Sequence, residues 1–332
     1  MKETLGWAIL GTGKIANRFA FALNNLPDRA RIVAVGSRRK ETASEFADKW
    51  GIPGRYVGYE EVVADPDVDI VYIGTPGVFH RRDISMSLNN GKHVLCEKVL
   101  TMNEAEAKDV VDLARRKGLF LMEAMWTRFF PLHVRIRELL GAEALGTLRG
   151  LIAPFTATVP ADPKNRFYDV NLGAGVLLDL GSYGVSWAYN LFGEPEEFTG
   201  LASFGDTGAD YQSACVLRFA GGQIATITSS MISYDVKEAV VYGNRGKIVV
   251  HEPWYKPTAM TVYREGEEPE RFEFPLESYN GYEYEALAVM DSILDGKAEC
   301  EVMPLDESVE IIRILDGIRS QWGFSYPCER ET

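Results

Sequence analysis

The first 125 residues alternate short apolar runs with longer segments whose apolar positions recur at helical spacing. Short continuous apolar runs are typical of parallel strands buried on both faces, and their alternation with helices predicts a doubly wound α/β sheet. Asn103 and Glu106 have the spacing of a capping pair at the start of one helical segment. The predicted strands are Ala8–Leu10, Ile32–Gly36, Ile70–Gly74, His93–Cys96 and Phe120–Met122, and the predicted helices are Lys14–Leu26, Lys40–Trp50, Tyr59–Ala64, Arg81–Asn90 and Glu104–Lys117.

The pattern changes after Met125. A helix over Leu132–Leu140 leads into longer segments in which apolar and polar residues alternate, separated by turn signals such as Asn244-Arg245-Gly246. This alternation predicts a mostly antiparallel sheet. The predicted strands are Leu148–Thr158, Glu197–Phe204, Ser213–Phe219, Gln223–Met231, Glu238–Tyr242, Lys247–His251 and Met260–Tyr263, and the remaining predicted helices are Ala174–Phe192, Tyr282–Asp295 and Leu305–Trp322.

We therefore expect two domains. Residues 1–125 predict an α/β domain with a doubly wound parallel sheet, and residues 126–332 predict an α+β domain with a large, mostly antiparallel open sheet. The second domain has few helices to cover both faces of its sheet. Because an uncovered sheet face with apolar positions usually meets a partner, we expect a homo-oligomer.

The composition excludes several kinds of partner. The 332 residues carry a net charge of −13, which argues against nucleic acid as a partner and requires local positive groups to hold any anionic cofactor. The chain has no run of about 18 apolar residues, so we expect no membrane span. It shows no secretory signal pattern, and its 4 cysteines lack paired spacing, so we expect a reduced, cytoplasmic protein.

A glycine-rich segment, Gly11-Thr12-Gly13-Lys14-Ile15-Ala16, lies between the first predicted strand and the first predicted helix. The first glycine permits a tight turn, the second lets the backbone approach phosphates, and the small Ala16 lets helix and strand pack closely. The helix start offers unpaired N–H groups to an anion. This combination predicts a Rossmann dinucleotide-binding domain, with an ordinary strand-to-helix turn as the alternative interpretation.

The second predicted strand ends in Ser37-Arg38-Arg39-Lys40, without the carboxylate that usually binds the adenosine ribose of NAD. Guanidinium groups pair with a 2′-phosphate, so these residues favour NADP over NAD. The alternative is that they only solvate a helix start. However, cations at a helix N-terminus oppose the helix dipole, which indicates that an anion lies nearby.

Two further segments carry side chains suited to acid–base chemistry. Glu97-Lys98 follows the fourth of these predicted strands, at a strand end where charged side chains project toward ligands, although a solvent-exposed lysine is the alternative. Asp179 and Tyr183 are four residues apart on the predicted helix and would share one face. Tyr183 could transfer a proton if a cation such as Lys98 lowered the pKa of its hydroxyl, whereas a tyrosine at the helix surface is the alternative.

These motifs together resemble the Gfo/Idh/MocA oxidoreductase family. Gly11 to Ala16, Thr75-Pro76 with His80, Glu97-Lys98, and Asp179 with Tyr183 match in order and spacing over essentially the whole chain. The segment 119–131 is most similar to the dihydrodiol dehydrogenase and NADP-dependent xylose dehydrogenase branch. The resemblance implies NADP as cofactor, a lysine–tyrosine pair and a homodimer joined through the C-terminal sheets.

The resemblance also implies a role for individual residues. Tyr183 would be the general acid/base, Lys98 its electrostatic partner, and Asp179 a positioning group. The residues implied in cofactor binding are Gly11, Thr12, Gly13, Lys14 and Ile15 at the pyrophosphate; Ser37, Arg38 and Arg39 at the 2′-phosphate; Thr75, Pro76 and His80 along the path to the nicotinamide; Glu97 and Lys98 at its end; and Trp126, Arg128 and Arg166 as contacts to cofactor or substrate.

One residue departs from the family pattern. The family usually has proline after Glu-Lys, but this chain has Val99, which would alter how Lys98 is presented. No metal site is expected, because the other histidines have no ligand spacing with His80.

The leading hypothesis is an NADP-dependent oxidoreductase that transfers hydride between the nicotinamide and a sugar or cyclic diol, with Tyr183 carrying the proton. Some aromatic residues would form apolar walls or, equally well, belong to the core: Phe129, Phe130, Phe155, Phe167 and Tyr168. A redox sensor that binds NADP(H) without turnover is one alternative. Glycoside hydrolysis or epimerisation through transient NAD oxidation is another, and Arg38-Arg39 argues against it.

Overall fold

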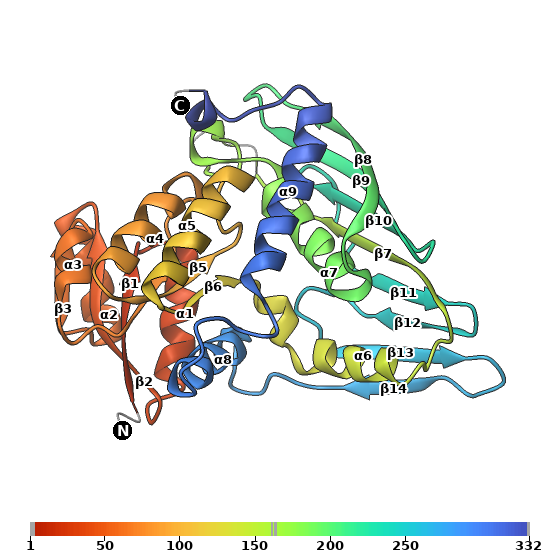
Figure 1. The fold of residues 1–332 in the computed structure, drawn as a ribbon, viewed down its shortest axis with the longest axis horizontal. Coiled ribbons are helices and arrows are strands. Elements are labelled where there is room, and N and C mark those ends of the chain that lie inside the picture. The colour runs from red at the N-terminus through yellow and green to blue at the C-terminus, as the bar shows by residue number, and fades with distance from the viewer. Residues whose placement is uncertain (1–3, 161, 163–164, 331–332) are drawn as a thin grey trace. The chain divides into compact units, whose positions relative to one another are not determined.

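The computed structural model describes residues 4–160, 162 and 165–330 of the chain. They form two compact units, of which the first combines Met1–Trp126 with Leu276–Val309. The second combines Thr127–Pro275 with Glu310–Thr332. The segment 276–309, which the sequence analysis assigned to the second domain, thus packs with the first unit (Figure 1).

The first unit contains a six-stranded parallel sheet in the order β3-β2-β1-β4-β5-β6. The order changes direction between β1 and β4, and this switch point is where ligands bind in doubly wound folds. The strands are β1 (Leu5–Leu10), β2 (Ala30–Ser37), β3 (Gly54–Val57), β4 (Ile70–Ile73), β5 (His93–Glu97) and β6 (Leu121–Ala124). The central strands β1 and β4 are buried along their whole length, as their apolar runs predict.

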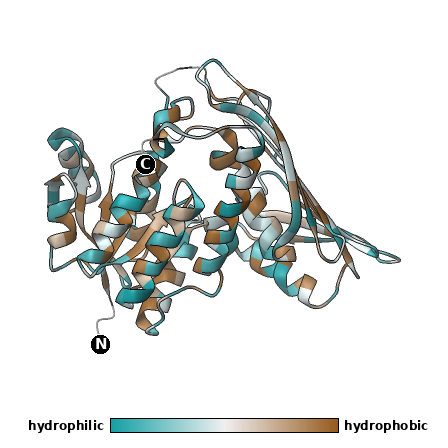
Figure 2. Ribbon diagram, turned by 45° about the horizontal axis from the view of Figure 1, so that its top comes forward, coloured by the Kyte–Doolittle hydropathy of each residue, from teal (hydrophilic) through white to brown (hydrophobic). Residues whose placement is uncertain are grey.

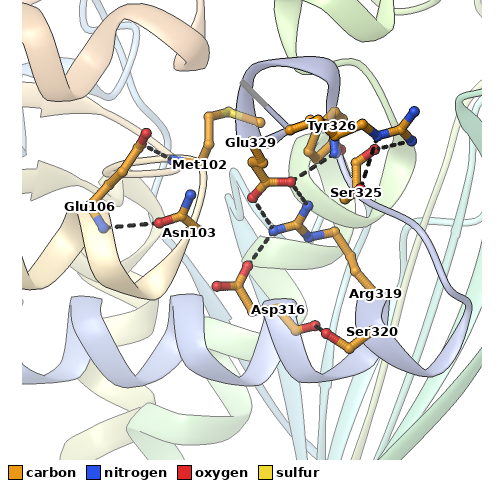
Figure 3. Close-up of polar contacts among 10 residues, drawn as sticks. Met102, Asn103, Glu106, Asp316, Arg319, Ser320, Ser325, Tyr326 and Glu329 are labelled. Carbon is orange, nitrogen blue, oxygen red and sulfur yellow. Dashed lines mark hydrogen bonds and ion pairs between the residues drawn. The ribbon is translucent and has the colours of Figure 1, made fainter. Parts of the chain in front are cut away.

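Helices α1, α2 and α4 pack directly on this sheet, and α5 packs on α4. The Asn103 side chain accepts a hydrogen bond from the Glu106 N–H at 2.9 Å, and Glu106 Oε2 accepts one from the Met102 N–H at 3.3 Å, so the predicted capping pair is confirmed (Figure 3). The helices are α1 (Lys14–Asn24), α2 (Lys40–Trp50), α3 (Glu60–Ala64), α4 (His80–Asn89), α5 (Glu104–Lys117) and α8 (Tyr282–Leu294), and a short 3-10 turn, η1 (Gly77–Phe79), precedes α4.

Helix α8 packs against α1 through buried polar contacts. Glu283 is fully buried, accepts hydrogen bonds from the Asn280 and Gly281 N–H groups, and receives the Asn25 amide at 2.9 Å. Arg29 also forms an ion pair with Asp291. These contacts attach the segment 276–309 to the rest of the first unit.

The second unit contains an eight-stranded sheet in the order β14-β13-β12-β11-β7-β10-β9-β8. Every neighbouring pair is antiparallel except β7 and β10. The strands are β7 (Leu148–Thr156), β8 (Pro195–Phe204), β9 (Asp210–Phe219), β10 (Ile224–Ser230), β11 (Ala239–Gly243), β12 (Gly246–Val250), β13 (Ala259–Arg264) and β14 (Glu270–Glu273). The predicted fold class, a parallel sheet followed by a mostly antiparallel open sheet, is confirmed.

One face of the second sheet is covered by helices. The π-helical turn η4 (Leu177–Gly181) and α7 (Ser182–Phe192) pack on β7 and β10, and the later part of α9 (Leu305–Gln321) packs on β8. Buried and exposed residues alternate along β9, and Figure 2 shows apolar and polar positions interleaved on these strands. Other short elements are α6 (Pro131–Gly141) and the turns η2 (Trp126–Phe129), η3 (Val170–Leu172) and η5 (Pro327–Glu329).

The single helix predicted over Ala174–Phe192 is wrong at its start. Ala174 and Gly175 are not helical, and Gly175 has a φ of +148°; the chain then runs through η4 before α7 begins at Ser182. A π-helical turn has more residues per turn than an α-helix, and such turns are frequent at functional sites.

In the described part of the chain, no helix is both long enough and apolar enough to cross a membrane. Cys96, Cys215 and Cys300 are buried free thiols, and burial raises the pKa of Cys215 to about 12. Within the same described residues, no cluster of His, Cys, Asp or Glu has the composition of a metal site.

Candidate functional site

The turn after β1 and the turn after β4 meet at the switch point of the parallel sheet. Gly11 has a φ of +95°, and a Cβ atom there would lie 3.1 Å from the Gly74 carbonyl oxygen. A side chain at position 11 would therefore be strained twice, by the backbone conformation and by the neighbouring turn. Ala16, one turn further on, is fully buried, as close helix–strand packing requires.

The N-terminus of α1 has no side-chain cap, and the space beside Gly13 is open. Gly13 precedes the helix in an extended conformation, no side chain caps it, and the first turn contains no acidic residue. A Cβ atom at Gly13 would meet no heavy atom within 4 Å. These are the features of a helix start that receives an anionic group, and Thr12, Lys14 and Ile15 flank it.

The end of β2 presents a hydroxyl and two guanidinium groups. Ser37 is buried, and its hydroxyl lies 2.7 Å from that of Thr42 and 3.5 Å from that of Thr12. Arg38 and Arg39 are exposed, and neither forms an ion pair with a carboxylate among the described residues. This strand end therefore offers uncompensated positive charge close to the glycine turn.

His80 joins the segments that follow β4 and β5. Its Nε2 lies 2.8 Å from the Thr75 carbonyl oxygen, and its Nδ1 lies 2.8 Å from the Val99 carbonyl oxygen. Burial lowers the pKa of the ring below its ordinary value, although both carbonyls oppose this. The Thr75 hydroxyl donates to buried Asp83 at 2.8 Å. His80 thus shapes the backbone beside Lys98, and the proposed cofactor contacts of Thr75, Pro76 and His80 stay predictions.

Glu97 and Lys98 follow β5 at the same edge of the sheet. The Tyr72 hydroxyl donates to Glu97 Oε1 at 2.6 Å, and the Glu123 carboxylate on β6 accepts the Leu100 N–H at 3.0 Å. Lys98 is half-buried, and the peptide bond between Lys98 and Val99 is cis. Hydrogen bonds at Glu97 and at Leu100 therefore hold the chain on both sides of Lys98.

Sequence reasoning missed a second carboxyl group near Glu97. Glu285, on α8, is fully buried and has no hydrogen-bond partner in the described part of the chain. Burial, and then the charge of Glu97, raises the pKa of its carboxyl well above the usual range. The sequence carries no signal of this burial, because the first turn of a helix, where Glu285 lies, also suits an exposed carboxylate.

In the second unit, Asp179 and Tyr183 lie beside an arginine and an aromatic cluster. Asp179 Oδ1 accepts from Arg166 Nη1 at 3.3 Å, and Arg166 lies over the Phe167 ring at 4.3 Å. The Tyr183 ring centre lies 5.7 Å from that of Phe155 and 6.1 Å from that of Tyr255. Tyr255, which stacks on Phe155 at 4.0 Å, was missed because it lies in a loop without periodic pattern.

Most of the remaining candidate residues pack against, or are hydrogen-bonded to, other residues of their own unit. Trp126 stacks on Tyr282 with ring centres 4.2 Å apart in the first unit. Arg128 is buried and donates to the Ser186 hydroxyl and carbonyl oxygen on α7, both at 3.0 Å. Phe155 and Tyr168 belong to a buried cluster with Phe167 against it. Lys98 lies in the first unit and Tyr183 in the second, and their cooperation stays a prediction.

Comparison with known proteins agrees with this architecture. Residues 5–125 match the family described as "Oxidoreductase family, NAD-binding Rossmann fold", and residues 133–249 match the Gfo/Idh/MocA C-terminal domain. The chain belongs to the Gfo/Idh/MocA oxidoreductase family, as its motifs predicted. It is an oxidoreductase of the dehydrogenase and reductase class.

Individual relatives match over nearly their whole length. The chain is 35% identical over 331 residues to trans-1,2-dihydrobenzene-1,2-diol dehydrogenase of Xenopus tropicalis, covering 97% of this chain and 99% of the relative. A 3-ketoreductase from Actinomadura kijaniata, solved with NADP and TDP-benzene, is 26% identical with a TM-score of 0.86, over 96% of this chain and 97% of that one. An aldose-aldose oxidoreductase from Caulobacter crescentus, solved with glycerol, is 26% identical with a TM-score of 0.87, over 97% and 98%.

Proposed function

We propose that the protein is an NADP-dependent oxidoreductase that transfers hydride between the nicotinamide and a hydroxyl- or carbonyl-bearing carbon of a sugar or cyclic diol. One observation carries the proposal: the open start of α1, the exposed Arg38 and the half-buried Lys98 all follow strands at the carboxyl edge of one parallel sheet. Ligands of this fold bind at that edge.

The residues present fit NADP. Gly11 and Gly13 leave the α1 N-terminus accessible to a pyrophosphate, together with Thr12, Lys14 and Ile15. Ser37, Arg38 and Arg39 would hold the 2′-phosphate, which a carboxylate at the end of β2 would repel. Thr75, Pro76, His80 and Glu97 would line the rest of the cofactor, with Trp126, Arg128 and Arg166 as further contacts to cofactor or substrate. When bound, the nicotinamide supplies or accepts the hydride.

Three side chains would act on the substrate. Tyr183 would carry the proton to or from the substrate oxygen, and the Lys98 ammonium would stabilise the phenolate or oxyanion that forms. Asp179 would position the reacting groups through its ion pair with Arg166. The aromatic rings of Phe155 and Tyr255 beside Tyr183 would face the apolar side of a sugar ring or cyclic diol.

The named relatives support this substrate class. One group of relatives is named for a cyclic diol, one solved structure for an aldose and another for a ketoreduction with NADP bound. A polyol or its carbonyl form is the chemistry that these names share.

We also propose that the protein is a homodimer joined through the open sheet of the second unit. Ile152, Leu201, Val216 and Ile224 are large, exposed apolar residues on neighbouring strands. The strand register places them on one face, opposite the face that packs against η4 and α7. An exposed apolar row of this kind marks a protein interface.

The function is tested by following the absorbance of the nicotinamide with purified protein, NADP and a panel of aldoses, inositols and dihydrodiols. We expect turnover with at least one polyol, and a lower KM for NADP than for NAD. Tight NADPH binding without turnover over the whole panel would instead support the redox-sensor alternative.

A further inference from the structure

The turn that carries Asp179 is held at its start by a buried carboxyl group of the same unit. Asp210, the first residue of β9, is 2% exposed, and its Oδ2 accepts a hydrogen bond from the Leu177 N–H at 2.8 Å. Leu177 opens η4, which contains Asp179 and continues into α7, where Tyr183 is the second residue. Because N–H groups at a helix start lack partners within the helix, a carboxylate placed there fixes the first turn.

The same carboxyl group also lies against Gly175, two residues before this turn. Gly175 has a φ of +148°, and a Cβ atom there would lie 1.9 Å from Asp210 Oδ1. The Gly175 carbonyl accepts the Asp179 N–H at 3.0 Å. The backbone therefore contacts Asp210 at both Gly175 and Leu177, and a shift of the carboxyl group would move the backbone of Asp179.

The C-terminal segment covers this contact. Tyr326 is fully buried, and its hydroxyl would lie 3.2 Å from a Cβ atom at Gly175. The Arg319 guanidinium lies 4.9 Å from the Tyr326 ring centre and bonds both carboxylate oxygens of Glu329, at 2.9 and 3.0 Å, and the Asp316 carboxylate (Figure 3). This clamp holds Tyr326 over Asp210 and excludes water from it.

Burial of Asp210 places the titration of its carboxyl group near neutral pH. Burial raises the pKa of Asp210 to about 7; the Leu177 N–H and the Arg319 charge act against this, and the Asp179 charge adds to it. Tyr326 stays neutral, because burial and then Asp210 raise the pKa of its hydroxyl well above the usual range. On its own strand, Asp210 contributes to the raised pKa of Cys215. The hydrogen bond to Leu177 is strongest when Asp210 is ionised.

We propose that Asp210 is a positioning residue, which acts through Leu177 and Gly175 to set the orientation of η4 and thereby of Asp179 and Tyr183. The proposal rests on the proposed function, because that function assigns the proton transfer to the side chains that this turn presents. In this role Asp210 contacts neither the substrate nor the cofactor.

Four variants of the full-length protein test this role. Asp210→Asn keeps an acceptor oxygen for Leu177 but cannot ionise, and Asp210→Ala removes the acceptor. Gly175→Ala brings a Cβ atom into the position of the carboxyl group. Val241 is fully buried on β11, and Val241→Ala is the control for a general loss of stability in the same unit.

We expect Asp210→Ala and Gly175→Ala to lower kcat about tenfold or more with the KM for NADP changed less than about twofold, because only transition-state positioning is lost. Asp210→Asn should keep kcat within about threefold of wild type and lose the inflection that Asp210 adds to the pH profile of kcat near pH 7. Amide hydrogen exchange at Leu177 and Asp179 should accelerate in Asp210→Ala and not in Asp210→Asn.

A kcat for Asp210→Ala equal to that of wild type, or to that of an equally destabilised Val241→Ala, would overturn the proposal. If Asp210→Ala does not fold, kcat is compared between Asp210→Asn and Gly175→Ala. The proposal predicts the lower kcat for Gly175→Ala, and equal values would overturn it. If wild type shows no turnover on any substrate, the proposed function fails. Hydrogen exchange at Leu177 and Asp179 then still supports the positioning role if Asp210→Ala accelerates it, and overturns that role if it does not.

Discussion

The Nδ1 atom of His80 lies 2.8 Å from the carbonyl oxygen of Val99, the residue directly after Lys98. The other ring nitrogen lies at the same distance from the Thr75 carbonyl oxygen, so one imidazole connects the ends of β4 and β5. Burial lowers the pKa of this ring, and both of its hydrogen-bond contacts are to backbone carbonyl oxygens, so His80 acts on the backbone. The backbone that carries Lys98 is therefore held in part by His80.

His80→Ala should lower kcat about tenfold, because losing a buried hydrogen bond of about 1–3 kcal/mol frees the backbone beside Lys98. His93→Ala is the matched control. His93 is likewise hydrogen-bonded to the backbone, in this case by accepting from the Phe120 N–H at 3.0 Å, but it lies at the opposite end of β5. Steady-state kinetics on both variants checks the prediction, and an equal loss of kcat in the two would contradict it.

Arg38→Ala should raise the KM for NADP about 10- to 100-fold and change the KM for NAD less than about threefold, because only NADP carries the 2′-phosphate that a charge-assisted hydrogen bond would hold. Arg31→Ala removes an exposed arginine from the other end of β2 and serves as control. Kinetics with both cofactors measures the effect. An equal rise for NAD and NADP would show that Arg38 does not bind the 2′-phosphate.

Much of the fold could be predicted because its signals are local. Buried apolar runs marked the central parallel strands, and the glycine at position 11 marked a turn that the structure closes with a positive φ. Strands β3 and β14 were missed, because they are four-residue edge strands with few buried positions. The packing of α8 on α1 depends on contacts such as that of Asn25 with Glu283, which are 258 residues apart and have no local signal.

In the candidate site, too, some features have a local signal in the sequence and others depend on contacts between distant segments. The spacing of Asp179 and Tyr183 was visible in the sequence, whereas the hydrogen bond from Leu177, at the start of the π-helical turn that contains Asp179, to Asp210 on another strand was not. The ion pair of Asp179 with Arg166 and the stacking of Tyr255 on Phe155 likewise join separate segments. Local patterns thus identified the chemical groups, and tertiary contacts determine how they are held.

Acid should destabilise the second unit through His133. Its Nε2 lies 3.1 Å from the Trp254 carbonyl oxygen, its ring packs edge-on to Trp187, and burial lowers its pKa to about 4. Between pH 6.5 and 4 the unfolded chain binds the proton more tightly than the folded unit, so the free energy of unfolding falls as the pH falls, by about 3 kcal/mol in total.

His133→Gln should remove most of this pH dependence, because glutamine keeps a donor for the Trp254 carbonyl and does not titrate. Urea unfolding at several pH values, followed by tryptophan fluorescence, measures it. The control is His251→Gln, at a half-buried histidine of the same unit. If His133→Gln loses stability with falling pH as steeply as wild type, the assignment to His133 is wrong.

The proposed dimer should dissociate when charge is placed on the uncovered sheet face. Leu201 is 81% exposed and Val216 is 40% exposed on neighbouring strands of that face. The double variant Leu201→Glu, Val216→Glu should give particles of one chain mass, because burying unpaired carboxylates in an apolar interface is strongly unfavourable. Val57→Glu, on the edge strand of the first unit, should leave the dimer intact. Sedimentation of wild type as a monomer would refute the proposed interface.

The central claim is that Tyr183 transfers the proton while Lys98 supplies the positive charge. Single-turnover hydride transfer, measured with saturating NADP and the best substrate of the panel, tests it most directly. For Tyr183→Phe and Lys98→Met we expect rates at least about 100-fold below wild type with cofactor affinity within about threefold, since general acid–base catalysis contributes about 10²- to 10⁴-fold. Tyr189→Phe on the same helix should be unaffected. A rate near that of wild type in either catalytic variant would contradict the proposed mechanism.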